Sequence, residues 1–417
     1  MTEDWKNRFN VSIQPGLDRM RALMERLGSP EIGVPVVHVA GTNGKGSTAA
    51  MIAAGLSAAG YRVGLTVSPD LGRVNDRILI DGEPIADQEA ESLAGAVEAA
   101  GREIGDPPTF FEAVVAMAFL AFRRRRVDLA VIEVGLGGRL DATNVIPAPR
   151  VGVITPIHFD HMDFLGHRIE QIAAEKAGIL KPGSTLVLAD QPFAAAVQTV
   201  LRRAGELGVV IRRPLGRWGV DGDGPWYAPP GGTVVRSGLA GAYQAQNLAT
   251  AWTALETLAE QGLALEWTRV ARGVAAARWR GRFDIISRAP LTVFDGAHNP
   301  HGAQALAESL RVEPWSSFGW HLLFGGLADK PLDAMLKILE PEMRSVTLTS
   351  VSGRRGMDPK RVAGQWHGAR PPVVIPDALR AYASVRQRAL GEGTQGAVLV
   401  TGSLAFLADL LTAGVGS

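Results

Sequence analysis

The segment from Gly41 to Thr48 reads Gly-Thr-Asn-Gly-Lys-Gly-Ser-Thr and joins an apolar run to an alanine-rich stretch. Glycines let backbone N–H groups turn toward phosphate oxygens, a lysine offsets phosphate charge, and a hydroxyl can reach Mg²⁺. The standard pattern would place glycine at Val39 and a hydroxyl residue at Gly46. The alternative is a tight turn with a surface lysine. We expect a phosphate loop, and its contacting residues would be Thr42, Asn43, Gly44, Lys45, Gly46 and Ser47.

Polar side chains also follow three further apolar runs. They are Ser68, Glu133 and the segment 158–163, which holds two histidines and two aspartates. Ligands of parallel sheets bind at the carboxyl ends of strands, and Mg²⁺ prefers oxygen ligands. Glu133 is therefore a candidate magnesium ligand, and Ser68 could bring a hydroxyl to the same ion. The competing interpretations are a glycine-rich turn with an exposed glutamate, a turn cap, and ordinary loop histidines.

Three other segments have both a chemical and a plain structural interpretation. Lys176 precedes a glycine and reads as an ordinary lysine at a helix end. Asp295–Pro300 follows an apolar run, so its polar groups are expected at a strand's carboxyl edge. Phe110 and Phe111, followed by Glu112, are more often core residues than a stacking platform.

Short β-branched runs alternate with helical stretches from Val36 onward, which predicts an α/β fold with parallel sheets. Gly, Pro, Trp and Asp concentrate between Arg212 and Ser237, which predicts a small antiparallel patch. A helix is expected over Gln244–Leu258. The expected strands are Val36–Ala40, Tyr61–Val67, Leu129–Gly135, Val151–Ile157, Thr185–Ala189, Leu291–Phe294, His321–Phe324, Ser345–Val351, Val373–Ile375 and Ala397–Thr401.

Length predicts more than one domain, because 417 residues exceed the usual size of a single core. A turn at 279–282 and the Arg288-Ala289-Pro290 connection suggest a linker, so we expect domains over 1–286 and 287–417. Each would contain its own mostly parallel sheet. The second would be a doubly wound α/β domain.

Composition excludes several classes of function. Lys and Arg total 43 against 42 Asp and Glu, which argues against a nucleic-acid partner held by bulk charge. The sequence has no cysteine, so disulfides and thiolate metal sites are excluded. The longest apolar run, Ala113–Phe122, is shorter than the roughly 20 residues that span a bilayer. With a polar segment over 1–10, we expect no export signal, a cytoplasmic location and a monomer.

Taken together, these motifs resemble the folylpolyglutamate synthase and dihydrofolate synthase branch of the Mur-type amide ligases. The resemblance extends over nearly the whole chain, and glycine after the loop lysine is typical of the folate branch. The matching segments are His38–Ser47, Ser68-Pro69, Arg77-Ile78, Thr109–Glu112, Glu133–Asn144, Asp160-His161, Leu165-Gly166, Glu175–Ala177, Gln244, Asn247, Gly281-Arg282, Asp295–Pro300 and Gly402–Leu404.

The resemblance implies an ATPase domain with a phosphate loop and a Rossmann-like C-terminal glutamate ligase domain. It also implies ATP and two Mg²⁺ ions, with Lys176 carbamylated and helping to bind the second ion. The substrates would be L-glutamate and dihydropteroate or reduced folates, joined through an acyl phosphate. The implied catalytic residues are Lys45, His161, Lys176, Arg282 and His298; the metal ligands Ser68, Glu133, His161 and Lys176; the nucleotide contacts, beside the loop, Asn247, Arg282 and Asp295; and the substrate contacts Phe110, Phe111, Glu112 and Asp141.

Four positions depart from the family pattern. Asp70 and Tyr243 stand where the family usually has histidine, Asp76 where it has glutamate, and His158 where it has a small residue. We expect both glutamate additions from this chain. The alternatives are folylpolyglutamate synthase activity alone, a Mur-type ligase for another carboxylate acceptor, and a nucleotide switch that ligates nothing, although the chain has no Asn-Lys-x-Asp guanine-reading segment.

Overall fold

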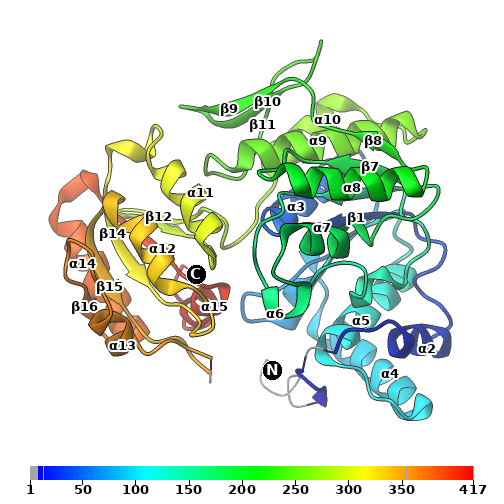
Figure 1. The fold of residues 1–417 in the computed structure, drawn as a ribbon, viewed down its shortest axis with the longest axis horizontal. Coiled ribbons are helices and arrows are strands. Elements are labelled where there is room, and N and C mark those ends of the chain that lie inside the picture. Colours follow the sequence, from blue (N-terminus) through cyan, green and yellow to red (C-terminus); the bar gives the residue numbers. More distant parts are fainter. Residues whose placement is uncertain (1–7, 13, 354, 417) are drawn as a thin grey trace. The chain divides into compact units, whose positions relative to one another are not determined.

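A computed structural model describes residues 8–12, 14–353 and 355–416 of the chain. Most of the segment on which the absence of an export signal was predicted, residues 1–10, lies outside the described residues. The chain divides into two compact units (Figure 1). Unit 1 takes the described residues up to Arg217, with Tyr227–Gly238 and Gln246–Ala277. Unit 2 takes Trp218–Trp226, Leu239–Ala245 and the described residues from Arg278 onward.

The sheet of unit 1 has the strand order β4-β3-β2-β5-β1-β6-β7-β8. Strands β2, β5, β1, β6, β7 and β8 pair in parallel, whereas β3 and β4 join the edge in antiparallel pairs. The strands are β1 (Val36–Ala40), β2 (Val63–Thr66), β3 (Ile78–Ile80), β4 (Glu83–Pro84), β5 (Leu129–Glu133), β6 (Val151–Ile154), β7 (Thr185–Leu188) and β8 (Val210–Arg212).

Helices cover this sheet because the central strands are buried on both faces. On one side α2, α4 and α5 pack together over a large apolar core (Figure 1). Helix α3 packs against α10, and α7 packs against α8. The helices are α2 (Asp18–Arg26), α3 (Lys45–Ala58), α4 (Asp87–Ile104), α5 (Phe110–Arg125), α6 (Met162–Leu165), α7 (Ile169–Ala177), α8 (Ala194–Glu206), α9 (Gln244–Glu260) and α10 (Trp267–Ala276).

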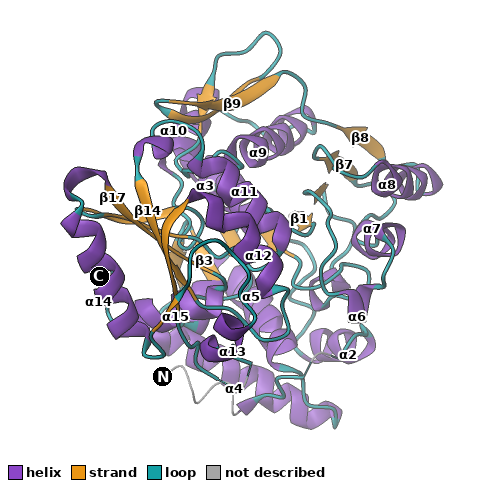
Figure 2. Ribbon diagram, turned by 60° about the vertical axis from the view of Figure 1, so that its left-hand side comes forward, coloured by secondary structure: helices purple, strands orange, loops and turns teal. Residues whose placement is uncertain are grey.

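The sheet of unit 2 has the order β12-β13-β17-β14-β15-β16, with β12 antiparallel to β13 and the other pairs parallel. Helices α11 and α12 pack on one face and α14 and α15 on the other, as Figure 2 shows in purple. The elements are β12 (Asp284–Arg288), β13 (Leu291–Phe294), α11 (Pro300–Leu310), β14 (Gly319–Phe324), α12 (Leu332–Leu339), β15 (Met343–Leu348), α13 (Pro359–Gly364), β16 (Val373–Val374), α14 (Ala378–Gly391), β17 (Gly396–Thr401) and α15 (Leu404–Thr412).

The predicted fold class is confirmed: the described residues form two doubly wound sheets and a separate small one. The small sheet has the order β11-β10-β9, formed by β9 (Arg217–Asp221), β10 (Gly224–Ala228) and β11 (Val235–Arg236). The prediction missed β3, β4, β8 and β12, which are short or lie at sheet edges. The predicted domain boundary at 286/287 falls inside β12. Among the described residues, no helix combines the length and the apolar character needed to cross a bilayer.

Candidate active site

The strand order of unit 1 determines which polar residues share an edge. Strands β2, β5, β1 and β6 are neighbours and run parallel. Their carboxyl ends lead, in that order, to Ser68, Glu133, the loop at Gly41–Gly44 and the segment that starts at His158. The phosphate loop and the candidate metal ligands therefore lie along one edge of one sheet, where parallel sheets bind ligands.

The phosphate loop is held in shape by a left-handed glycine and by hydrogen bonds to the segment that follows β6. Gly44 has φ 85°, and α3 begins at the next residue, so the loop turns sharply into the helix N-terminus. The Thr42 N–H donates to the Pro156 carbonyl at 2.9 Å, and the Thr42 hydroxyl donates to the His158 carbonyl at 3.1 Å. Lys45 Nζ donates to the Thr42 carbonyl at 3.0 Å. The result is a preformed anion-binding turn with a lysine folded over it.

Asn247, from α9, lies directly against this loop. A Cβ atom at Gly44 would collide with the Asn247 amide, and Asn247 is buried. The loop therefore requires glycine at position 44 for two reasons: the left-handed backbone and the close approach of this side chain.

Ser68 and Glu133, both predicted metal ligands, are brought together. The Ser68 backbone N–H donates to Glu133 Oε2 at 3.1 Å, and Glu133 is 5 % exposed. Within the described parts of the chain, no group of three or more His, Cys, Asp or Glu side chains is arranged to hold a metal ion. Of the four predicted metal ligands, only Glu133 and His161 are of these residue types. The other two are Ser68 and Lys176. A carboxylate and a hydroxyl are oxygen donors suited to Mg²⁺.

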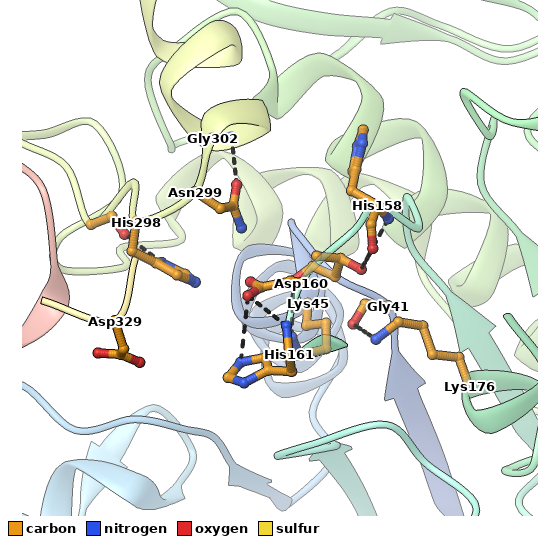
Figure 3. Close-up of polar contacts among 12 residues, drawn as sticks. Gly41, Lys45, His158, Asp160, His161, Lys176, His298, Asn299, Gly302 and Asp329 are labelled. Carbon is orange, nitrogen blue, oxygen red and sulfur yellow. Dashed lines mark hydrogen bonds and ion pairs between the residues drawn. The ribbon is translucent and has the colours of Figure 1, made fainter. Parts of the chain in front are cut away.

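Lys176 is not the surface lysine that a helix end alone would suggest. It is 4 % exposed, and its Nζ donates to the Gly41 carbonyl at 2.7 Å (Figure 3). Burial lowers the pKa of Lys176 to about 7, and the charge of Lys45 makes a smaller contribution in the same direction. The charges of Asp160 and Asp141 oppose this shift. A substantial fraction of the side chain is therefore a neutral, nucleophilic amine near neutral pH.

His161 directly precedes the short helix α6 (Met162–Leu165) and has a left-handed conformation with φ 50°. Its backbone N–H donates to Asp160 Oδ1 at 2.9 Å, and its ring Nε2 lies 3.9 Å from the same oxygen (Figure 3). The backbone of His158 exchanges hydrogen bonds with the Thr42 hydroxyl. The unusual His158 is therefore joined to the phosphate loop through its backbone.

The predicted substrate residues have different environments. Phe111 is partly exposed, whereas Phe110 is buried. Glu112 closes a capping box: Oε2 accepts the Thr109 N–H at 2.7 Å and Arg19 Nε at 2.8 Å. This carboxylate has a structural role at the start of α5, which the Thr-x-x-Glu spacing could have indicated.

Asp141 is also engaged with its surroundings. Its Oδ1 accepts the N–H and hydroxyl of Thr143 at 3.0 and 2.6 Å, and its Oδ2 accepts the Leu136 N–H at 2.8 Å. Buried His38 Nε2 lies 2.8 Å from the Thr143 hydroxyl. Because that hydroxyl donates to Asp141, it accepts from His38. A chain of hydrogen bonds therefore runs from β1 to the glycine-rich loop after β5, at residues 135–138.

Sequence reasoning did not assign a role to Arg77, which occupies a distinctive place. Its Nε donates to Asp70 Oδ2 at 2.6 Å, and both side chains are mostly buried. Its guanidinium lies 5.1 Å from the centre of the Phe110 ring, within cation–π distance. Asp70 therefore pairs with an arginine that lies over Phe110, one of the predicted substrate residues.

Unit 2 contributes its own set of predicted residues. Asp295 follows β13 and is 3 % exposed, and its carboxylate accepts the N–H groups of Phe283 and Ala297. His298 Nδ1 lies 2.9 Å from the Gly296 carbonyl, and Asn299 caps α11 by accepting the Gly302 N–H at 2.8 Å (Figure 3). These polar groups occupy the carboxyl end of β13, as predicted.

The chain is a two-unit α/β protein whose phosphate loop lies at the edge of a mostly parallel sheet. The Mur ligase middle domain model matches residues 39–210, and the Mur ligase glutamate ligase domain model matches residues 281–404. The Bacillus subtilis dihydrofolate synthase/folylpolyglutamate synthase is 35% identical, covering 97% of this chain and 96% of the relative.

Two solved structures extend the comparison. Mycobacterium tuberculosis folylpolyglutamate synthase complexed with ADP and AMPPCP has a TM-score of 0.87 and 33% identity, covering 96% of each chain. A bifunctional folylpolyglutamate synthase/dihydrofolate synthase with Mn, AMPPNP and L-glutamate bound has a TM-score of 0.80 and 30% identity, covering 97% of this chain and 95% of that one. The chain belongs to the Mur ligase family, in its dihydrofolate synthase/folylpolyglutamate synthase branch.

Proposed function

We propose that this protein is an ATP-dependent ligase that adds L-glutamate to dihydropteroate and to the glutamate tail of reduced folates. The observation that carries the proposal is the single sheet edge that holds the phosphate loop, the Ser68–Glu133 pair and buried Lys176. The family relationship supports the same reaction. The alternatives that stay open are tail extension alone and a different carboxylate acceptor.

The reaction requires activation of a carboxylate. A carboxylate does not react with an amine at neutral pH, so the γ-phosphoryl group of ATP is first transferred to it, giving an acyl phosphate and ADP. The glutamate amine then attacks the carbonyl carbon, and phosphate leaves as the amide forms. Lys45 and the N–H groups at the start of α3 are placed to offset the charge on the transferred group.

The oxygen donors at the strand ends fit a divalent ion. We assign Ser68, Glu133 and His161 to Mg²⁺, and Lys176 in carbamylated form to a second Mg²⁺. Bound Mg²⁺ would supply positive charge that polarises the phosphate groups. The chain's own contribution is to hold Glu133 against the Ser68 N–H in a buried position.

Carbamylation of Lys176 suits its environment. The neutral amine attacks the carbon of CO₂, and one proton is released as the N–C bond forms, leaving a carbamate anion. With its pKa lowered to about 7, Lys176 supplies that neutral amine. The remaining N–H can keep the bond to the Gly41 carbonyl, while the new negative charge lies near Lys45.

The remaining assignments follow the same scheme. We assign Asn247, Arg282 and Asp295 to the nucleotide and His298 to the reacting groups. For the acceptor we assign Phe110, Phe111, Glu112 and Asp141; Phe111 is the most exposed of them, and the other three are buried. An ATP-binding domain over 1–286, a glutamate ligase domain over 287–417, a monomeric state and a cytoplasmic location stay predictions.

The test is ATP- and Mg²⁺-dependent incorporation of L-glutamate by the purified chain, run in parallel with dihydropteroate and tetrahydrofolate. Incorporation on both acceptors would establish both activities, and incorporation on one would identify the half that this chain performs. If ATP binds and neither acceptor is used, the proposed acceptors are wrong.

A further inference from the structure

Two side chains of unit 2 that are far apart in the sequence meet in a short hydrogen bond. The Tyr243 hydroxyl donates to Asp295 Oδ2 at 2.6 Å across 52 positions of the chain. The Phe283 N–H also donates to Oδ2, at 2.9 Å, and the Ala297 N–H donates to Oδ1 at 2.9 Å. Asp295 is therefore a buried carboxylate whose two oxygens have different surroundings.

The direction of the hydrogen bond follows from the chemistry of the two groups. An ionised carboxylate only accepts, so the phenol must donate. Burial raises the pKa of the Tyr243 hydroxyl well above its usual value, and the charge of Asp295 adds a smaller rise. The hydroxyl therefore keeps its proton. Burial also raises the pKa of Asp295, and the Tyr243 hydrogen bond and the Arg282 charge oppose that rise. Tyr243 thus favours the charged form of Asp295.

Arg282 completes this cluster in unit 2. A Cβ atom at Gly296 would collide with the Arg282 guanidinium, so glycine at this position leaves room for the cation beside Asp295. The Gly296 N–H donates to the Gly281 carbonyl at 2.8 Å, which joins the two segments. The segment that carries Tyr243 is joined to the same unit by the Ala242 N–H, which donates to the Ser309 hydroxyl at 2.9 Å.

The two oxygens of Asp295 are left with unequal capacity for a ligand. Each carboxylate oxygen has about two acceptor positions. Oδ2 accepts two hydrogen bonds, from Tyr243 and Phe283, whereas Oδ1 accepts one from Ala297 among the described residues. The remaining acceptor position therefore belongs to Oδ1.

We propose that Tyr243 is a positioning residue for the ligase reaction: its hydroxyl holds Asp295 Oδ2 and so directs Oδ1 toward the nucleotide. This inference rests on the proposed function, which assigns Asp295 to ATP.

The experiment compares Tyr243→Phe, Asp295→Asn and the double variant in the full chain, and measures the Kd for ATP with Mg²⁺ and the KM values for ATP and glutamate. Tyr243→Phe removes one hydroxyl, and we expect the Kd and KM for ATP to rise roughly tenfold. The KM for glutamate should change less than about twofold. In the Asp295→Asn background, Tyr243→Phe should raise the Kd for ATP by less than about a further twofold, because the hydroxyl acts through the carboxylate.

The matched control is Tyr382→Phe, which also removes a tyrosine hydroxyl in unit 2, from a partly buried ring that packs against Phe294. It should leave the Kd for ATP unchanged. Wild-type ATP affinity in Tyr243→Phe would overturn the inference, and so would an equal loss in the Asp295→Asn background. A chain that binds ATP but ligates no acceptor would overturn the proposed function, while the Kd for ATP would still decide the role of Tyr243.

Discussion

In the proposed reaction, Lys45 of the phosphate loop supplies charge to the ATP phosphates and Glu133, at the end of β5, supplies charge to Mg²⁺. Lys45→Ala leaves the loop backbone intact, and Glu133→Gln keeps an acceptor for the Ser68 N–H while removing the charge. We expect each to lower turnover at least about 100-fold with little change in the melting temperature. Lys337→Ala, which breaks an exposed ion pair with Asp333, is the control. Turnover near that of the wild type in either site variant would remove the phosphate and metal assignments.

His38 predicts a pH dependence of stability. Burial, and next the charge of Lys181, lower its pKa to about 3, against about 6.5 for an unperturbed histidine. As pH falls below 6.5, the unfolded chain takes up a proton at His38 that the folded chain refuses, so stability falls toward acid pH.

The free energy of unfolding should decrease by about 2 kcal/mol between pH 7 and pH 5 because of this one group. Urea unfolding of the wild type and of His38→Gln at both pH values isolates the contribution, since the variant lacks it. His367→Gln, at an exposed position, is the control. Identical pH dependence in wild type and His38→Gln would contradict the assignment.

At the scale of elements, the segment between β2 and β3 is held by the Asp70–Arg77 ion pair and by the contact of Arg77 with Phe110. Arg77→Lys keeps the charge but loses the planar contact with the ring. We expect it to raise the KM of the folate acceptor several-fold, about 3- to 10-fold, and to leave the KM of ATP unchanged. The comparison variant is Arg73→Lys, because Arg73 lies in the same segment and its exposed ion pair is with Asp87 of α4. Equal effects of the two substitutions would argue against a role for Arg77 in acceptor binding.

Local patterns determined most of what could be predicted about elements. The run from Val36 to Ala40, the glycine loop and the alanine-rich helix after it are adjacent in the sequence, so their signals reinforce each other. Strand β12 was taken for a linker because it lies at a sheet edge between two turns and pairs with β13 alone. An edge strand has a weak pattern, since part of it faces solvent.

The sequence alone could not predict roles that depend on partners far away along the chain. The family pattern marked Tyr243 and Asp70 as departures, but their partners, Asp295 and Arg77, emerge only when the chain is folded. Lys176 reads as an ordinary helix lysine from the residues alone, because the Gly41 carbonyl that accepts from its Nζ lies 135 positions away along the chain.

The chain passes between the two units more than once. Unit 2 contains 239–245 as well as the described residues from 278 onward, and the predicted boundary at 286/287 divides β12. A fragment that starts at 287 therefore loses most of an edge strand, together with Tyr243 and the Ala242–Ser309 bond.

We expect a fragment of residues 287–417 to unfold at a lower urea concentration than one of 278–417, and both to be less stable than unit 2 within the full chain. Unfolding followed by circular dichroism measures the order. If the shorter fragment matches the longer one, β12 contributes nothing to the stability of this sheet, and the boundary at 286/287 is the better one.

Because the chain alternates between the two units, the segments of each unit are completed in a fixed order during synthesis on the ribosome. Tyr243 leaves the exit tunnel well before Asp295, and residues 246–277, which belong to unit 1, are made in between. All described segments of unit 1 are therefore translated before Asp295, whose carboxylate accepts the hydrogen bond of Tyr243. The nucleotide-facing carboxylate therefore acquires its final orientation late, so a truncated nascent chain can fold its phosphate loop without becoming a competent ligase.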